Sequence, residues 1–100
     1  MKSKRTKAME INPKVRKEVK ERDFNICIIC GCRQGVQVMH YIGRGAGGLG
    51  IPQNLGMGCV QCHMEMDQGL KKKEHLKVFR DYLTRIYPNW DESKLRYRKH

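Results

Sequence analysis

The sequence predicts a small α+β domain that is closed by a four-cysteine zinc site. Two Cys-x2-Cys pairs, Cys27/Cys30 and Cys59/Cys62, are separated by the 28 residues 31–58. Four thiolates are a ligand set that structural zinc prefers, and two such pairs can supply them without strain. A short β-branched run between the pairs and a helical periodicity after them predict the β and α parts. At 100 residues the chain is expected to form one domain, whose thin core a structural metal would help to stabilise.

The first part of the chain is expected to form a basic arm followed by a helix. We assign residues 1–11 to the arm and residues 12–98 to the single domain. Asn12 can cap a helix, and Pro13 suits the first helical position. The helix that they start is expected to run to about Asp23, just before the first cysteine pair.

The segment between the cysteine pairs is expected to form two short strands joined by a glycine-rich loop. Strand 36–39 ends where His40 begins, and strand 55–58 leads back to the second pair. Residues 43–50 contain five glycines in eight positions, which favours neither a helix nor a regular strand. Because this stretch lacks a Gly-Lys-Ser/Thr ending, we interpret it as a loop between strands rather than as a phosphate-cradling loop.

Two helices are expected after the second cysteine pair. The first should span about 60–68, since Gly69 is a good residue to follow a helix end. The second should span about 72–87 and end before Pro88. Its apolar residues recur at spacings of three and four and predict a core-facing stripe, which comprises Leu76, Phe79, Leu83 and Ile86.

The charge distribution favours a nucleic acid as the partner. The net charge is +11, and it is concentrated in two flanks. Residues 1–22 carry nine Lys/Arg against three Asp/Glu, and residues 71–100 carry ten against four, whereas residues 23–70 are nearly neutral. Such basic flanks suit DNA or RNA, with binding that weakens as salt rises. Solubility alone is the alternative explanation of the charge.

The sequence also bears on the location of the protein and the state of its cysteines. No apolar stretch approaches the length of a membrane span, and no secretory segment follows the first Met, so we expect a cytoplasmic protein with no membrane partner. Paired Cys-x2-Cys spacing in that setting favours zinc over disulfides, which remain the alternative. Cys32, the fifth cysteine, is expected to take no part in the site.

His63 and Asp67 are candidate ligands for a second, catalytic metal. They are four residues apart on the helix expected at 60–68, so both side chains point from one face. An imidazole and a carboxylate there form half of a divalent metal site. In the alternative reading, His63 only follows the cysteine pair and Asp67 is a solvated acid.

His40 and Asn54 are candidate catalytic residues in the segment that zinc would close. A neutral imidazole with a pKa near ~6.5 can take a proton from water. Asn54 can orient an imidazole or ligate a metal through its amide oxygen. A structural histidine and a turn asparagine are the alternatives.

Together these residues resemble the HNH endonuclease pattern. The order is Cys27-x2-Cys30, His40, Gly47-Gly48, Asn54 and Cys59-x2-Cys62-His63, and Tyr-Pro-x-Trp at 87–90 is similar to small phage-encoded HNH proteins. The resemblance covers roughly residues 12–98. It implies a ββα-metal (His-Me finger) core at about 36–69, hydrolysis of DNA phosphodiester bonds, and work near phage genome packaging in the host cytoplasm beside terminase subunits.

The resemblance also implies roles for individual residues. His40 would be the general base, and Asn54 would orient His40 or ligate the metal. His63, together with Asp67, would hold a catalytic Mg²⁺, Mn²⁺ or another transition ion, which polarises the scissile phosphate. Arg44 would hold a phosphate. The implied enzyme is an endonuclease or nickase with low intrinsic sequence specificity.

One position departs from the family pattern. Many HNH enzymes have Asp or His immediately before the general base as a metal ligand, and this chain has Met39. A thioether is a poor ligand for Mg²⁺ or Mn²⁺. Either Asp67 and Asn54 compensate, or the metal binds weakly, or catalysis is impaired. A non-catalytic zinc module that binds nucleic acid, and an adaptor for an acidic protein partner, are the rival functions.

Overall fold

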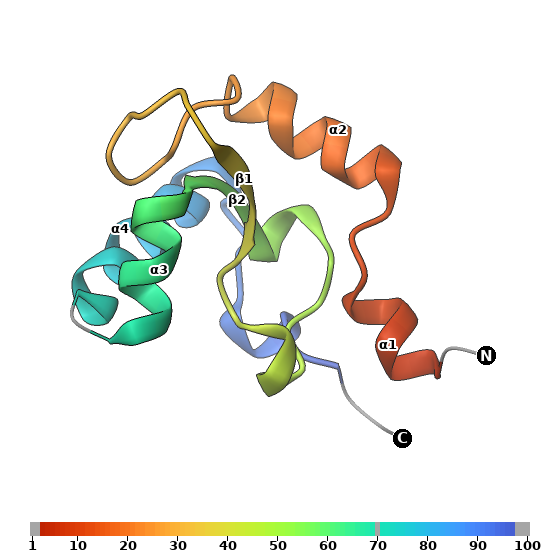
Figure 1. Cartoon of the computed structure of the whole chain (residues 1–100). Helices are drawn as coiled ribbons and strands as arrows, with labels where there is room; N and C mark the ends of the chain where they lie inside the picture. The colour runs from red at the N-terminus through yellow and green to blue at the C-terminus, as the bar shows by residue number, and fades with distance from the viewer. Residues whose placement is uncertain (1–2, 70, 98–100) are drawn as a thin grey trace.

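The fold places a two-stranded antiparallel sheet between helices, as Figure 1 shows. The computed structural model describes residues 3–69 and 71–97. Residues 1–2 of the basic arm, and residue 98 at the expected domain end with the basic tail beyond it, lie outside the described residues. The chain order is α1 (Lys4–Met9), α2 (Pro13–Arg22), β1 (Val36–His40), β2 (Leu55–Cys59), α3 (Val60–Gln68) and α4 (Lys72–Ile86), with 3-10 turns at Arg44–Ala46, Pro52–Asn54 and Glu92–Lys94.

The sheet register puts the cysteine pairs and His40 at opposite ends of the hairpin. Val36 pairs with Cys59 at one end, and His40 pairs with Leu55 at the other. Each strand is one residue longer than the sequence predicts, so that β1 includes His40 and β2 includes Cys59. The predicted α+β class and the two strands are therefore confirmed.

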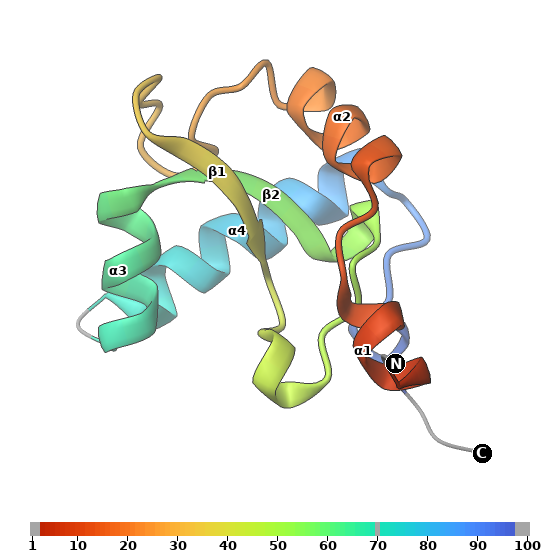
Figure 2. The same ribbon diagram turned by 45° about the vertical axis from the view of Figure 1, so that its right-hand side comes forward.

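Alternating side chains give the sheet two buried faces. On one face, Val19 of α2 packs with Leu55 and Met57 of β2. On the other face, Met39 of β1 packs with residues of α3 and α4, namely Met66, Phe79 and Leu83. Figures 1 and 2 show this sandwich, with α2 on one side of the hairpin and α3 and α4 on the other. Of the stripe predicted for α4, Phe79 and Leu83 are confirmed as core with no exposed surface, whereas Leu76 and Ile86 are half-buried.

Two of the predicted helices, α2 and α3, have caps at the expected positions. The side chain of Asn12 accepts a hydrogen bond from the backbone N–H of Lys14 at 2.7 Å, and Pro13 occupies the first turn of α2. Cys59 caps α3, and Gly69 ends it in the left-handed conformation at φ 84°. The sequence prediction relied on Asn12, Pro13 and Gly69, whereas it did not include the cap by Cys59.

A further helix, α1, forms in the segment that the sequence predicts to be only a basic arm. Ser3 caps it by accepting a hydrogen bond from the N–H of Thr6, and Met9 is buried at its end. Six residues are too few for a helix that is stable alone in water. The packing of Met9 against the rest of the chain therefore decides that this segment is helical.

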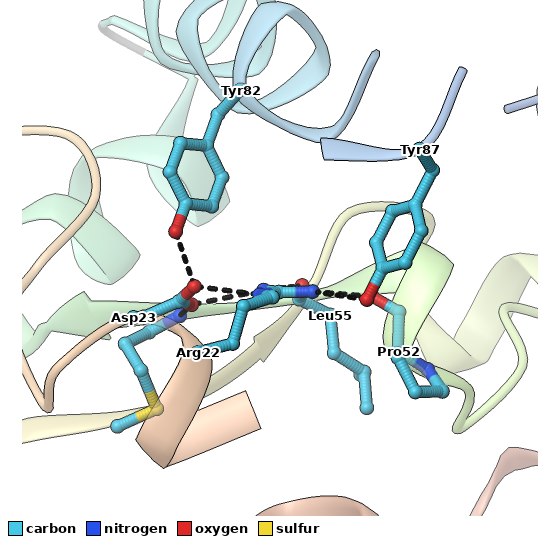
Figure 3. A network of polar contacts seen from close by, with 7 residues as sticks. Arg22, Asp23, Pro52, Leu55, Tyr82 and Tyr87 are labelled. Carbon is cyan, nitrogen blue, oxygen red and sulfur yellow. Dashed lines mark hydrogen bonds and ion pairs between the residues drawn. The ribbon is translucent and has the colours of Figure 1, made fainter. Parts of the chain in front are cut away.

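A buried ion pair connects α2 to the rest of the domain (Figure 3). The Nε of Arg22 lies 2.6 Å from Oδ1 of Asp23, and the side chain of Asp23 is fully buried. The guanidinium group also donates to the backbone carbonyls of Pro52 and Leu55 at 2.9 and 2.6 Å. Since these carbonyls flank Asn54, Arg22 attaches the end of α2 directly to the start of β2.

The carboxylate of Asp23 extends the network to β2 and α4. It accepts hydrogen bonds from the backbone N–H of Met57, at 2.9 Å, and from the hydroxyl of Tyr82. Burial and the bond to Asp23 raise the pKa of Tyr82 to about 12. Every buried side-chain nitrogen and oxygen of the described residues has a hydrogen-bond partner, so the network is fully satisfied.

Within the described residues, none of the helices combines the length and the apolar character needed to cross a membrane.

Candidate functional site

Four of the five cysteines lie together at the end of the hairpin where β1 begins and β2 ends. The sulfur atoms of Cys27, Cys30, Cys59 and Cys62 all lie within 4.8 Å of one another. Cys30 is exposed, and the other three are buried. Cys32 lies outside this group, and its sulfur contacts the backbone of Gln34 instead. The predicted thiol group is confirmed, and it could hold a structural metal ion such as zinc.

The local backbone suits thiolate ligands. The N–H of Cys30 points to the sulfur of Cys27 at 3.5 Å, and the N–H of Cys62 points to the sulfur of Cys59 at 3.4 Å. Burial alone would raise the pKa of Cys27, but neighbouring backbone N–H groups outweigh it and lower the pKa to about 7. Such donors stabilise negative sulfur, which is the form that binds zinc. Burial and the neighbouring thiols raise the pKa of Cys62, so the four thiols do not all ionise equally easily.

A second group of potential ligands, which the sequence does not predict, lies between α3 and α4. It consists of Cys62, Glu65 and His75. Nε2 of His75 lies 2.8 Å from the carboxylate of Glu65, and Lys71 is 3.7 Å from the same carboxylate. The bond to His75 lowers the pKa of Glu65. The pairing joins α3 to α4, and Cys62 already belongs to the four-thiol group.

At the opposite end of the hairpin, Asn54 holds the glycine loop, which we define as residues 43–50. Asn54 is fully buried. Its amide oxygen accepts from the N–H of Ile42 at 2.8 Å, and its amide nitrogen donates to the carbonyls of Ile42 and Leu49 at 3.1 and 2.8 Å. The side chain thereby joins the two ends of the loop. These bonds go to the backbone rather than to the His40 ring, and the predicted role in orienting His40 or ligating a metal stays a prediction.

The glycine loop is also held by both ends of the described chain. Leu49 donates to the carbonyl of Leu95, and Tyr97 donates to the carbonyl of Gly47, both at 2.8 Å. Gly50 donates to the carbonyl of Ala8 in α1 at 2.9 Å. A side chain at Gly48 would lie 1.6 Å from the carbonyl oxygen of Ile42, so only glycine fits there. The loop is therefore a fixed part of the structure.

His40 is half-buried at the end of β1, next to this loop. Its Nε2 lies 3.1 Å from the backbone carbonyl of Met9. Burial lowers the pKa of His40 below its usual value of 6.5. The hydrogen bond with the Met9 carbonyl raises this pKa, and the charges of Arg44, Arg16 and His63 lower it further. His40 is therefore neutral at pH 7 and able to accept a proton.

His63 and Asp67 face each other on α3, as their spacing predicts. Nε2 of His63 lies 3.5 Å from Oδ2 of Asp67, and their side chains are 44% and 72% exposed. Both groups are thus accessible from solvent. The two side chains are therefore near each other as predicted, and their role as metal ligands stays a prediction.

One groove brings together two of the candidate residues, His40 and Asp67, whereas His63 is not among its lining residues. The groove has a volume of about 370 Å³ and is lined by His40 of β1 and Asp67 of α3. Two exposed cations, Lys72 and Arg96, also line it. Glu92 lines the groove as well, so two carboxylates face the two cations. A proton acceptor, carboxylates and cations around one groove can bind a metal-bound anion and act on a water molecule beside it.

Met39 contributes to the core rather than to the groove. It is 1% exposed and packs with Met66, Phe79 and Leu83. Its side chain is thus that of an ordinary strand residue facing the core. The position before His40 therefore brings no oxygen or nitrogen ligand to His63 and Asp67.

Two features near the site have no signal in the sequence. The carbonyl of Met9 contacts His40, but any residue has a backbone carbonyl, and only the packing of α1 brings this one close. Arg96 lines the groove because residues 95–97 return to the glycine loop, a long-range contact that residue patterns do not reveal.

We compared the chain with known proteins, and no family model, curated protein or solved structure matches it.

Proposed function

We propose that the protein is a metal-dependent DNA endonuclease or nickase of the HNH type. The observation that carries the proposal is the groove that His40 and Asp67 share with Lys72 and Arg96. The hairpin followed by α3, with His40 on β1 and His63 on α3, supports a ββα-metal core. The resemblance of the motif to HNH enzymes supplies the reaction class.

In this proposal, the residues of the chain bind and activate the reactants. Lys72, Arg96 and Arg44 attract the phosphate through their positive charge. His40, neutral at pH 7, takes the proton from the attacking water. Asn54 keeps the backbone on both sides of the glycine loop in place, so that these groups keep their relative positions.

His63 and Asp67 would hold a divalent ion such as Mg²⁺ or Mn²⁺, because an imidazole and a carboxylate are ligands that such ions accept. The bound ion would polarise the scissile phosphate and stabilise the leaving oxygen. The basic flanks would hold the DNA backbone without reading its sequence, which predicts low intrinsic specificity. The proposal also includes a role in phage genome packaging beside terminase subunits.

Conversion of supercoiled plasmid to the nicked form tests the proposal. Zinc-loaded protein should nick when Mg²⁺, Mn²⁺ or Ni²⁺ is added, and it should not nick without an added ion. If His40→Ala and the wild type produce the same background under every condition, the non-catalytic nucleic-acid-binding module becomes the better explanation.

The pH dependence of nicking should reflect the lowered pKa of His40. A base must be neutral to act, and burial together with neighbouring cations favours the neutral ring. The rate at subsaturating DNA, which reports the free enzyme, should therefore stay high as pH falls and drop only below about 6.5, the usual imidazole pKa. A rate that is already half lost well above that pH would contradict this role of His40.

Asp67→Ala should weaken metal binding more than it slows the metal-saturated enzyme. Removing one of two proposed side-chain ligands should raise the metal concentration that gives half-maximal nicking by about tenfold or more. Gln68→Ala, an exposed change on the same helix, is the matched control. Metal titrations that are identical for Asp67→Ala and Gln68→Ala would remove Asp67 from the proposed site.

A further inference from the structure

The N-terminal helix packs directly against the glycine loop, beside the hairpin (Figure 2). Gly50 donates its N–H to the carbonyl of Ala8 at 2.9 Å. The two segments approach so closely that a Cβ at Gly50 would lie 2.0 Å from the carbonyl oxygen of Glu10 and 3.1 Å from that of Met9. Met9 itself is 7% exposed. The segment 3–10 is thus built into the wall of the domain at this point.

The same segment contacts His40 through one atom. The carbonyl oxygen of Met9 lies 3.1 Å from Nε2 of His40. A carbonyl can only accept a hydrogen bond, so Nε2 must carry the proton and donate it. A neutral imidazole holds one proton, which leaves the lone pair on Nδ1. The contact with Met9 thereby selects one of the two tautomers of His40.

We propose that the N-terminal segment is a working part of the site and that Met9 is a positioning residue for His40. Its carbonyl keeps the proton on Nε2 and the ring orientation fixed, so that Nδ1 is the atom that accepts a proton from water. This inference rests on the proposed nuclease function for its catalytic consequence. The tautomer and the role of α1 in selecting it can be tested without that function.

The structure offers a substitution that displaces the segment while the residues His40 and Met9 themselves stay unchanged. Gly50→Ala introduces a methyl group where the backbone of Glu10 lies, and this forces residues 8–10 away from the loop. Gly45→Ala is the matched control in the same loop, because a Cβ there meets nothing within 4 Å. Both variants add one methyl group to the glycine loop, so a difference between them reports the displacement of α1.

The test combines a spectroscopic measurement with the nicking assay. Long-range proton–nitrogen NMR correlations of zinc-loaded protein, without DNA or added divalent ion, identify the protonated ring nitrogen of His40. We expect protonation on Nε2 in the wild type and Gly45→Ala, and a mixture of tautomers in Gly50→Ala. Nicking by Gly50→Ala should fall by about 10- to 100-fold, as for other groups that orient a reactive histidine.

Three results would overturn the inference. The first is a wild-type His40 protonated on Nδ1, which needs no variant and so does not depend on the folding of Gly50→Ala. The second is an unchanged tautomer and unchanged nicking in a Gly50→Ala protein whose Ala8–Glu10 amide signals have shifted. The third is faster nicking by Gly50→Ala, since α1 would then obstruct the site. A wild type that never nicks, with the tautomers as expected, refutes the nuclease proposal and leaves the positioning contact standing.

Discussion

Cys59→Ser is expected to unfold the domain. Cys59 supplies one of four sulfurs in the thiol group and also caps α3. Binding of a structural zinc contributes on the order of 10 kcal/mol, which is comparable to the whole stability of a small domain, about 5–15 kcal/mol. With three thiols left, the protein should lose bound zinc and most of its helical circular dichroism at 25 °C, and chelation of zinc from the wild type should have the same effect.

Cys32→Ser is the matched control for this prediction. Cys32 lies beside the thiol group but outside it, and its sulfur contacts only the backbone of Gln34 among the bonds described above. This variant should retain one zinc per chain and melt near the wild-type temperature. Far less than one zinc per chain in freshly purified, reduced wild type would contradict the assignment, and so would a Cys59→Ser protein that remains folded.

Asp23→Ala is expected to destabilise the folded protein by about 3–5 kcal/mol, the usual effect of removing one partner from a buried ion pair. It leaves the guanidinium of Arg22, whose side chain is 12% exposed, without its carboxylate. It also removes the acceptor for the N–H of Met57 and for Tyr82. Arginine keeps its proton at neutral pH even when it is buried, so the cation in the variant cannot escape by becoming neutral.

The measurement is urea denaturation of zinc-loaded protein, with Asp81→Ala as the control. Asp81 pairs with Lys77 at 3.3 Å on the surface of α4, where the two side chains are 50% and 71% exposed. Removing that exposed pair should change stability by less than about 1 kcal/mol. Equal losses for Asp23→Ala and Asp81→Ala would show that the network in Figure 3 does not hold α2 to the sheet.

The parts of the fold that local sequence patterns encode were predictable. The three- and four-residue spacing of apolar side chains defines α4, and Asn12-Pro13 defines the start of α2. The two Cys-x2-Cys pairs predicted that residues on either side of the hairpin would meet, and their sulfurs do lie together. The helix signals and each Cys-x2-Cys pair act within a few residues, and the shared metal chemistry of the two pairs links them across the hairpin, so a single sequence reveals them.

The parts that depend on long-range packing were not predictable. Nothing local distinguishes Asp23 from a solvated acid at a helix end, because its partners come from β2 and α4. Helix α1 lacks a repeating apolar pattern and depends on the burial of Met9. For the candidate site, the residue types and the His63–Asp67 pairing followed from the sequence, whereas the backbone bonds of Asn54 and the Met9 contact with His40 did not.

The most direct test of the account is the rate at which His40→Ala nicks plasmid in Mg²⁺ or Mn²⁺, relative to His75→Gln. His75 is the matched histidine control. It pairs with Glu65 between α3 and α4 and is absent from the groove that His40 lines. With equal zinc content in all proteins, loss of a general base should slow nicking by about 10²- to 10⁴-fold, and His75→Gln should stay within a few-fold of the wild type. A His40→Ala protein that nicks as fast as His75→Gln would contradict the proposed nuclease site.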